Sequence, residues 1–207
     1  MWSMTEKPKR GRPRTFDRAA ALTAATRLFW ERGYEGVSIS ELTEAMGIRS
    51  GSLYAAFGDK KSLFEEVVDG YGQSPVGAFA GVALREESTA YEAFARILRE
   101  AAVIYPDPSH PAGCLAISAA TNVTPQDAEV QALLRNLRNK NVDGFEARLR
   151  EAQLEGELPV EASPRALADY FATVLQGLSQ RAQDGATAPQ LAEVAELALT
   201  AWPTTQR

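Results

Sequence analysis

The chain has 207 residues, of which 45% are hydrophobic and 24% are charged, and its formal net charge is −5. This is the composition of a soluble globular protein of one or two domains. No apolar run approaches the roughly 18 residues that a membrane-crossing helix needs, and the basic N-terminus lacks the apolar segment of a signal peptide. One cysteine and one histidine exclude an intramolecular disulfide and an ordinary structural zinc site. We therefore expect a cytoplasmic protein with no cofactor, no bound metal and no membrane partner.

The first 15 residues form a basic, proline-interrupted segment. Residues 1–71 carry 11 Lys or Arg and 10 Asp or Glu, whereas residues 72–207 carry 11 and 17. The local positive charge, rather than the acidic total, is what attracts DNA. We expect this arm to be disordered without DNA. Its core resembles an AT-hook, which lies in the minor groove of A·T-rich DNA, and the alternative is a tail that raises non-specific affinity by counterion release. The expected contacts are Lys9, Arg10, Arg12 and Arg14.

A helix is expected from about Asp17 to Arg32, with Asp17 as its N-cap and Gly33 as its end. Its apolar residues recur at helical spacing, so this helix is expected to brace the next segment.

Residues 37–64 predict two short helices joined by a tight turn. Ser38 and Glu41 form a capping-box pattern that begins the first helix near Ile39, and Gly47 ends it. The second helix begins at Ser50 and ends at Gly58. This is the helix-turn-helix pattern of residues 38–57, which places its second helix in the DNA major groove. The alternative on spacing alone is a plain helical hairpin.

The outward face of the second helix favours DNA binding. Its residues are small or hydrogen-bonding, and they include no carboxylate that would repel phosphates. A further helix is expected from Lys60 to about Tyr71, which puts Lys60 in a first turn, where a phosphate is favoured; the alternative is a solvated surface lysine. The expected DNA contacts in this segment are Ser38, Thr43, Arg49, Ser50, Gly51, Ser52, Tyr54, Ala55 and Lys60.

This stretch resembles the signature of tetracycline-repressor-like (TetR/AcrR) transcriptional regulators. The matching positions are Gly33, Tyr34, Val37, Ser38, Ile39, Leu42, Gly47, Ser50, Gly51, Leu53, Tyr54, Phe57, Lys60 and Leu63. Ala55 and Ala56 depart from the pattern, because many members carry an aromatic residue or histidine there. The resemblance implies an all-α fold of nine helices in two domains. Residues 16–71 would be the DNA-binding domain, and residues 72–207 the effector-binding and dimerisation domain.

The rest of the chain predicts five further helices and no strand. They span about 88–105, 113–121, 124–155, 163–183 and 187–202. The Gly-, Ser- and Pro-containing stretch at 70–77 is expected to be a joint between the domains.

The resemblance implies an effector pocket among the middle helices and a dimer interface on the last two. A pocket of the candidate residues would suit a small hydrophobic or aromatic effector, and each of them is also compatible with plain core packing. The candidates for the pocket are Phe94, Leu98, Tyr105, Cys114, Ile117, Ser118, Thr121, Leu137, Phe145, Tyr170, Phe171 and Val174. The candidates for the dimer interface are Leu175, Leu178, Leu191, Val194, Leu197 and Ala198, and their alternative is to cover the protomer's own core.

The resulting functional hypothesis is a repressor, acting as a homodimer on a palindromic operator and released from this DNA by a small molecule. The alternatives are a transcriptional activator and a sensor of oxidants or electrophiles acting through Cys114, whose expected place at a helix N-terminus would lower its pKa. No catalytic motif is recognisable, so we do not expect an enzyme.

Overall fold

The structure is a computed structural model that describes residues 17–119 and 123–203. Within these ranges the chain forms ten α-helices, one short 3-10 helix and no strand, which confirms the predicted all-α fold. The elements are α1 (Arg18–Arg32), α2 (Ile39–Ala45), α3 (Ser50–Phe57), α4 (Lys60–Gln73), α5 (Pro75–Glu86), α6 (Ala90–Ile104), α7 (Leu115–Ser118), η1 (Pro125–Asp127), α8 (Ala128–Leu154), α9 (Pro164–Gln183) and α10 (Ala188–Leu199).

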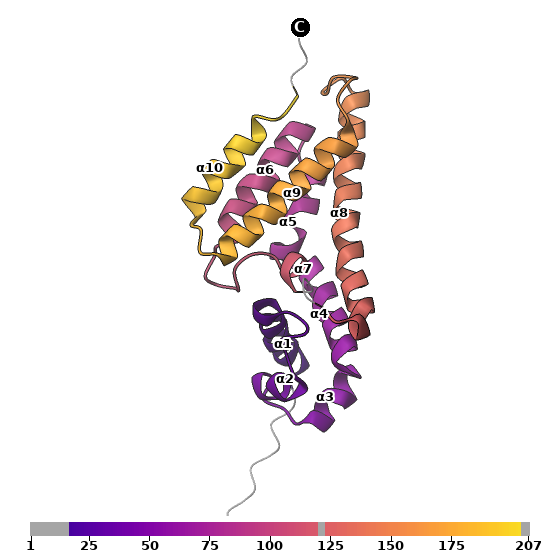
Figure 1. Cartoon of the computed structure of the whole chain (residues 1–207), viewed down its shortest axis with the longest axis vertical. Helices are drawn as coiled ribbons and strands as arrows, with labels where there is room; N and C mark the ends of the chain where they lie inside the picture. Colours follow the sequence, from indigo (N-terminus) through magenta and orange to yellow (C-terminus); the bar gives the residue numbers. More distant parts are fainter. Residues whose placement is uncertain (1–16, 120–122, 204–207) are drawn as a thin grey trace, which may run out of the picture.

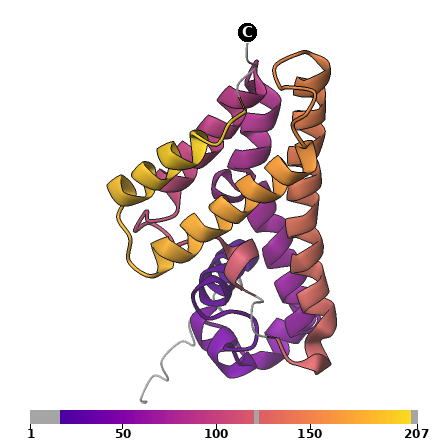
Figure 2. The same ribbon diagram turned by 45° about the horizontal axis from the view of Figure 1, so that its top comes forward.

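The helices form two groups joined by α4. Helices α1 to α3 make a small bundle at one end of the molecule, and α4 runs from this bundle into the other helices (Figure 1). Helix α4 contacts α1, α5, α7 and α8. The long helix α8 packs along α9, and α9 crosses between α8 and α10 (Figure 2). The boundary after residue 71 stays a prediction, because α4 continues across it.

Each group has its own aromatic core. Phe29 of α1 packs edge to face against Phe64 of α4, with ring centroids 5.0 Å apart. In the larger group, the ring centroid of Phe94 of α6 lies 4.7 Å from that of Phe171 of α9 and 5.1 Å from that of Phe145 of α8. All five rings are almost fully buried, so burial of aromatic surface supplies much of the stability of both groups.

The stretch at 70–77 contains the end of α4 and the start of α5, a tenth helix that the sequence does not predict, and its role as a joint between the domains stays a prediction. Helix α4 continues to Gln73, and Ser74 then caps α5 by accepting the backbone N–H of Gly77 at 3.1 Å. A Cβ at Gly77 would lie 2.0 Å from the carbonyl oxygen of Tyr71. Only glycine allows this close approach, so the small residues make a tight corner between α4 and α5.

Helix α7 is shorter than the predicted helix at 113–121. It begins after Gly113, whose φ of 81° is left-handed and whose Cβ would lie 2.9 Å from the carbonyl oxygen of Ser179. The backbone of the segment before α7 therefore lies in close contact with α9. The predicted helix at 124–155 likewise begins as η1, with α8 following from Ala128.

Candidate DNA-binding surface and effector region

The helix-turn-helix forms as the sequence predicts. Ser38 Oγ accepts the backbone N–H of Glu41 at 3.2 Å, and the Glu41 carboxylate accepts the backbone N–H of Ser38 at 2.8 Å. These bonds complete the capping box, and the Ser38 N–H is the main cause that lowers the pKa of Glu41. Gly47 ends α2 with a φ of 65°. The turn therefore fixes the direction of α3.

Helix α3 presents a polar, carboxylate-free face. Leu53 and Phe57 point into the core, whereas Tyr54 is 51% exposed. In the described part of the chain, no ion pair engages Arg49, which is the N-cap of α3 and is exposed. Six predicted contacts lie exposed on or next to α3, namely Arg49, Ser50, Gly51, Ser52, Tyr54 and Ala55.

Two other predicted contacts have partners inside the protein. Thr43 is only 9% exposed, and its hydroxyl donates to the carbonyl oxygen of Ser40 at 2.9 Å, so it belongs to the packing of α2. Ser38 is exposed, but its hydroxyl serves the capping box. We therefore leave both residues out of the candidate DNA surface. Lys9, Arg10, Arg12 and Arg14 lie outside the described residues.

Lys60 occupies a more protected place than the sequence suggests. Its Nζ lies 4.1 Å from the centre of the Tyr34 ring, which is a cation–π contact. The side chain is half-buried, and burial lowers its pKa. Asp59 caps α4 at this point by accepting the backbone N–H of Ser62 at 2.7 Å. Contact between Lys60 and a phosphate stays a prediction.

In addition to α4, side-chain contacts connect the two groups of helices, and the sequence does not reveal them. Tyr34 donates its hydroxyl to Asp127 at 3.4 Å, and Glu35 accepts the backbone N–H of Thr124 at 2.8 Å. Lys61 of α4 also pairs with Glu129 of α8. The partners are about 70 to 90 residues apart in sequence, so no local pattern marks them.

Six of the twelve predicted effector residues are buried in the core, Cys114 among them. Phe94, Leu98, Tyr105, Phe145 and Phe171 are almost fully buried, and the four aromatic rings among them pack against one another or against neighbouring side chains. The outer candidates are half-buried against this core or line surface grooves, and they are Ile117, Ser118, Leu137 and Val174. Tyr170 is exposed on α9, and Thr121 lies outside the described residues.

Cys114 lies between α4 and α9 rather than in an open pocket. The Tyr71 hydroxyl donates to Cys114 Sγ at 3.1 Å, and the Cys114 backbone N–H donates to Ser179 Oγ at 2.9 Å. The expected lowering of its pKa by a helix is wrong. Burial raises the pKa of the Cys114 thiol, and α7 has only four residues.

Four of the six predicted dimer residues face their own protomer. Leu175, Leu178, Leu191 and Ala198 are buried in the described chain. Val194 is 46% exposed and Leu197 is 69% exposed, so the outer face of α10 carries the unpartnered apolar surface.

The fold and the exposed face of α3 define a helix-turn-helix DNA-binding regulator with a helical second domain. In the described residues, no cluster of His, Cys, Asp and Glu has the arrangement of a metal site. None of the described helices has the length and hydropathy needed to cross a membrane.

Comparison with known proteins identifies the family. Residues 21–67 match the model for bacterial regulatory proteins of the tetR family, and residues 90–196 match the Tetracyclin repressor-like, C-terminal domain. The HTH-type transcriptional repressor ComR of Escherichia coli (strain K12) is 32% identical, with 95% of this chain and 94% of ComR covered. The repressor BdcR of the same organism is 30% identical, with 94% of each chain covered.

A solved structure has the same architecture. It is a cysteine mutant of the TetR family transcriptional regulator CifR complexed with 26-base-pair double-strand operator DNA. Its identity to this chain is 42% and its TM-score is 0.87, with 93% of this chain and 100% of that chain covered. The chain belongs to the TetR family of bacterial transcriptional regulators. The predicted family and the predicted function of a DNA-binding transcriptional repressor are confirmed.

Proposed function

We propose that this repressor acts in the cytoplasm as a homodimer that reads a palindromic operator with α3, and that a small effector releases it from DNA. The proposal assigns no catalytic reaction to the chain. The observation that carries it is the face of α3, which has an exposed Tyr54 and Arg49 and no carboxylate. CifR, which is 42% identical, has been solved with operator DNA.

The need for two helix-turn-helix units, or reading heads (residues 38–57 of each protomer), supports a dimer. One α3 reaches only a few bases, and two heads on half-sites one helical turn apart multiply the specificity. The exposed apolar residues of α10, Val194 and Leu197, supply surface for a partner. On α9, small and aromatic residues follow one exposed face at helical spacing, and they are Ala166, Tyr170, Thr173 and Gly177. A Cβ at Gly177 would meet nothing within 4 Å, so this face leaves room for a second helix.

Helix α4 is the proposed connection between effector and operator. It begins directly after the helix-turn-helix and packs against α5, α7 and α8. An effector that binds the DNA-free arrangement better than the DNA-bound one would shift the population towards release.

Selection of DNA by the purified protein tests this proposal. Fragments of the source genome are incubated with the protein, and the retained fragments are sequenced. We expect enrichment of an inverted repeat whose half-sites are one helical turn apart. Retention without any common sequence, by a folded dimer at physiological salt, would contradict the proposal.

The contact of Cys114 with α4 supports a second candidate, release by oxidants or electrophiles. Tyr71 of α4 donates to Cys114 Sγ, so modification of the thiol would disturb the helix that carries the reading head. The chain has a single cysteine, so Cys114→Ser removes all thiol chemistry. Burial and the raised pKa of the thiol oppose its reaction with oxidants. If this candidate holds, hydrogen peroxide releases the wild type from the enriched fragment and leaves Cys114→Ser bound. Equal behaviour of the two proteins would exclude this candidate.

A further inference from the structure

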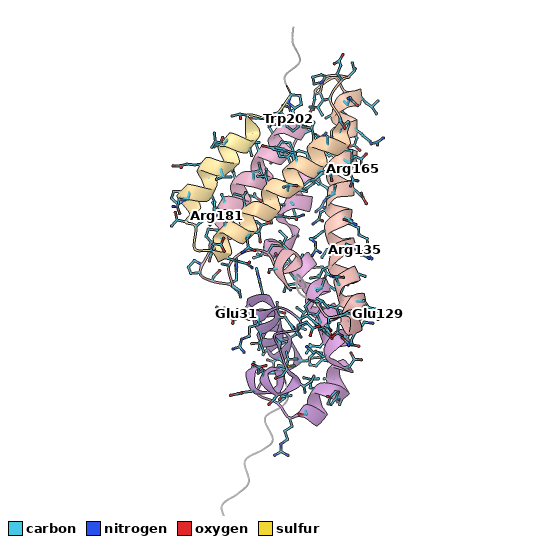
Figure 3. The ribbon with its side chains drawn as sticks, viewed as in Figure 1. Glu31, Glu129, Arg135, Arg165, Arg181 and Trp202 are labelled. Carbon is cyan, nitrogen blue, oxygen red and sulfur yellow. The ribbon has the colours of Figure 1, made fainter. Side chains whose placement is uncertain are left out.

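A polar groove of about 480 Å³ lies between α7, α8 and α9. Helix α8 contributes Gln131, Arg135 and Arg138, and α9 contributes Gln176 and Gln180. Arg135 is labelled on the half of α8 nearer to α7 (Figure 3). The lining contains two arginines and no Asp or Glu, although the whole chain has a net charge of −5. The groove is therefore locally cationic.

Neither arginine of the groove has a carboxylate partner in the described structure. Arg138 Nη1 donates to the backbone carbonyl of Ala116 at 2.8 Å, and no ion pair involves Arg135 or Arg138. Three other arginines of α8 and α9 are paired with carboxylates, namely Arg150, Arg165 and Arg181, whereas Arg148 donates to the backbone carbonyl of Ser88. The groove is thus distinguished by two arginines without a carboxylate partner that line the same surface.

The position of Arg138 makes an anion favourable there. Its side chain is half-buried, and burial is the largest cause of a lowered pKa. Cys114 opposes this shift, and the like charge of Arg135 adds to it. Burial and like-charge repulsion both disfavour a cation that has no countercharge beside it. A bound anion would supply it.

The amides on the facing helix add hydrogen-bond donors. Gln176 and Gln180 are four residues apart on α9, so both side chains lie on one face of that helix. Gln180 already donates to Asp184 at 3.1 Å, whereas no hydrogen bond of Gln176 is seen within the described ranges. The planar guanidinium groups match the paired oxygens of a carboxylate or a phosphate.

We propose that this groove binds the carboxylate or phosphate group of a small organic anion, and that this anion is the effector. This inference rests on the proposed function and gives the effector a chemical class. An anion that engages Arg138 competes with the carbonyl of Ala116 for its donors. Ala116 lies in α7, three residues before Ala119, whose carbonyl accepts the backbone N–H of Tyr34. The groove is thus connected through α7 to the DNA-binding domain.

Calorimetric titration of the full-length protein tests the inference. The probes are sodium phosphate, sodium hexanoate and uncharged hexanamide, each at millimolar concentration and matched ionic strength. We expect phosphate or hexanoate to bind at least tenfold more tightly than hexanamide. Phosphate alone would assign the site to phosphorylated effectors, and hexanoate alone to carboxylates. Equal affinity for hexanoate and hexanamide without phosphate binding, or binding of none of the three probes, would overturn the inference.

Three variants locate the binding. Arg135→Gln breaks no hydrogen bond of the described structure, and Arg138→Gln removes the bond to Ala116. Arg148→Gln is the matched control, because Arg148 also lies half-buried on α8 and donates to a backbone carbonyl, that of Ser88. We expect at least a tenfold loss of anion affinity in the first two variants and none in the control. Unchanged affinity in Arg135→Gln and Arg138→Gln would overturn the assignment.

Operator binding is measured separately on the same proteins. If the wild type binds operator and no anion, this inference fails and the proposed function stands. If it binds no operator at any anion concentration, the proposed function fails, and the anion titration still reports on the groove.

Discussion

The backbone N–H of Tyr34 donates to the carbonyl oxygen of Ala119 at 2.7 Å, which joins the DNA-binding domain to the end of α7. The Tyr34 side chain makes a second connection, since its hydroxyl donates to Asp127 at the start of α8. Its ring also lies beneath Lys60. Tyr34 is thus in contact with two segments of the effector domain, the end of α7 and the start of α8.

The Tyr34 hydroxyl predicts a pH dependence of stability. Burial, with the charge of Asp127 adding to it, raises the pKa of Tyr34 from 10 to about 12. The folded state therefore holds the tyrosine proton more tightly than the unfolded state does. The contribution of this group to the unfolding free energy is complete below pH 10 and is lost as the pH rises through 12. We expect the difference in unfolding free energy between the wild type and Tyr34→Phe to fall by about 1 kcal/mol between pH 9 and pH 11. Urea denaturation at both pH values measures it, and a constant difference would show that the hydroxyl is not protected.

Replacing a predicted effector residue tests its place in the core. Phe94 is fully buried between Phe145 and Phe171. We expect Phe94→Ala to reduce the unfolding free energy by about 3–5 kcal/mol, because a large buried ring leaves a cavity. Val103→Ala, at an exposed position of the same helix, is the control and should have little effect. A small loss in Phe94→Ala would indicate an open pocket instead.

The exposed apolar residues on the outer face of α10 give a test of the proposed dimer. Leu197→Glu places a charge in the proposed interface, where its desolvation opposes association. We expect sedimentation velocity to show a monomer and operator affinity to fall with it. Leu154→Glu at the end of α8, also a strongly exposed leucine, should leave the dimer intact. Dimers in both variants would place the interface elsewhere.

Lys60 gives a prediction about salt dependence. If its ammonium leaves the Tyr34 ring for a phosphate, Lys60→Gln should reduce the slope of log affinity against log salt by about 0.9, the value for one phosphate contact. Lys140→Gln on the exposed surface of α8 is the control. An unchanged slope would mean that Lys60 only stabilises Tyr34.

The basic arm predicts a larger change in the salt dependence of operator affinity than Lys60 does. Deleting residues 1–14 removes Lys9, Arg10, Arg12 and Arg14, and we expect lower operator affinity with a flatter salt dependence. The affinities of the full-length and shortened proteins are compared on operators with A·T-rich and with G·C-rich flanking sequence. This comparison separates minor-groove recognition from counterion release. An unchanged slope would show that the arm does not touch DNA.

Local signals predicted the helix-turn-helix well. The capping box of Ser38 with Glu41 forms, because it needs only residues three apart. The tenth helix was missed for the opposite reason. Glycine is a poor helix former, and the need for Gly77 arises from its approach to Tyr71 across a corner.

The candidate sites were harder to predict because burial depends on distant segments. Leu175 and Leu197 are both apolar residues at helical spacing, yet the first faces its own core and the second faces outward. Arg138 was not predicted as a site residue, because its lack of a carboxylate partner appears only when α7, α8 and α9 come together.

The central claim is that the face of α3 reads the operator. Fluorescence anisotropy with the enriched fragment and an unrelated duplex measures this for the wild type, Tyr54→Ala and the control Tyr91→Ala, an exposed tyrosine of α6. We predict that Tyr54→Ala loses at least tenfold in affinity for the operator, with unchanged thermal stability and unchanged binding to the unrelated duplex. Full operator affinity and specificity in Tyr54→Ala would contradict the account.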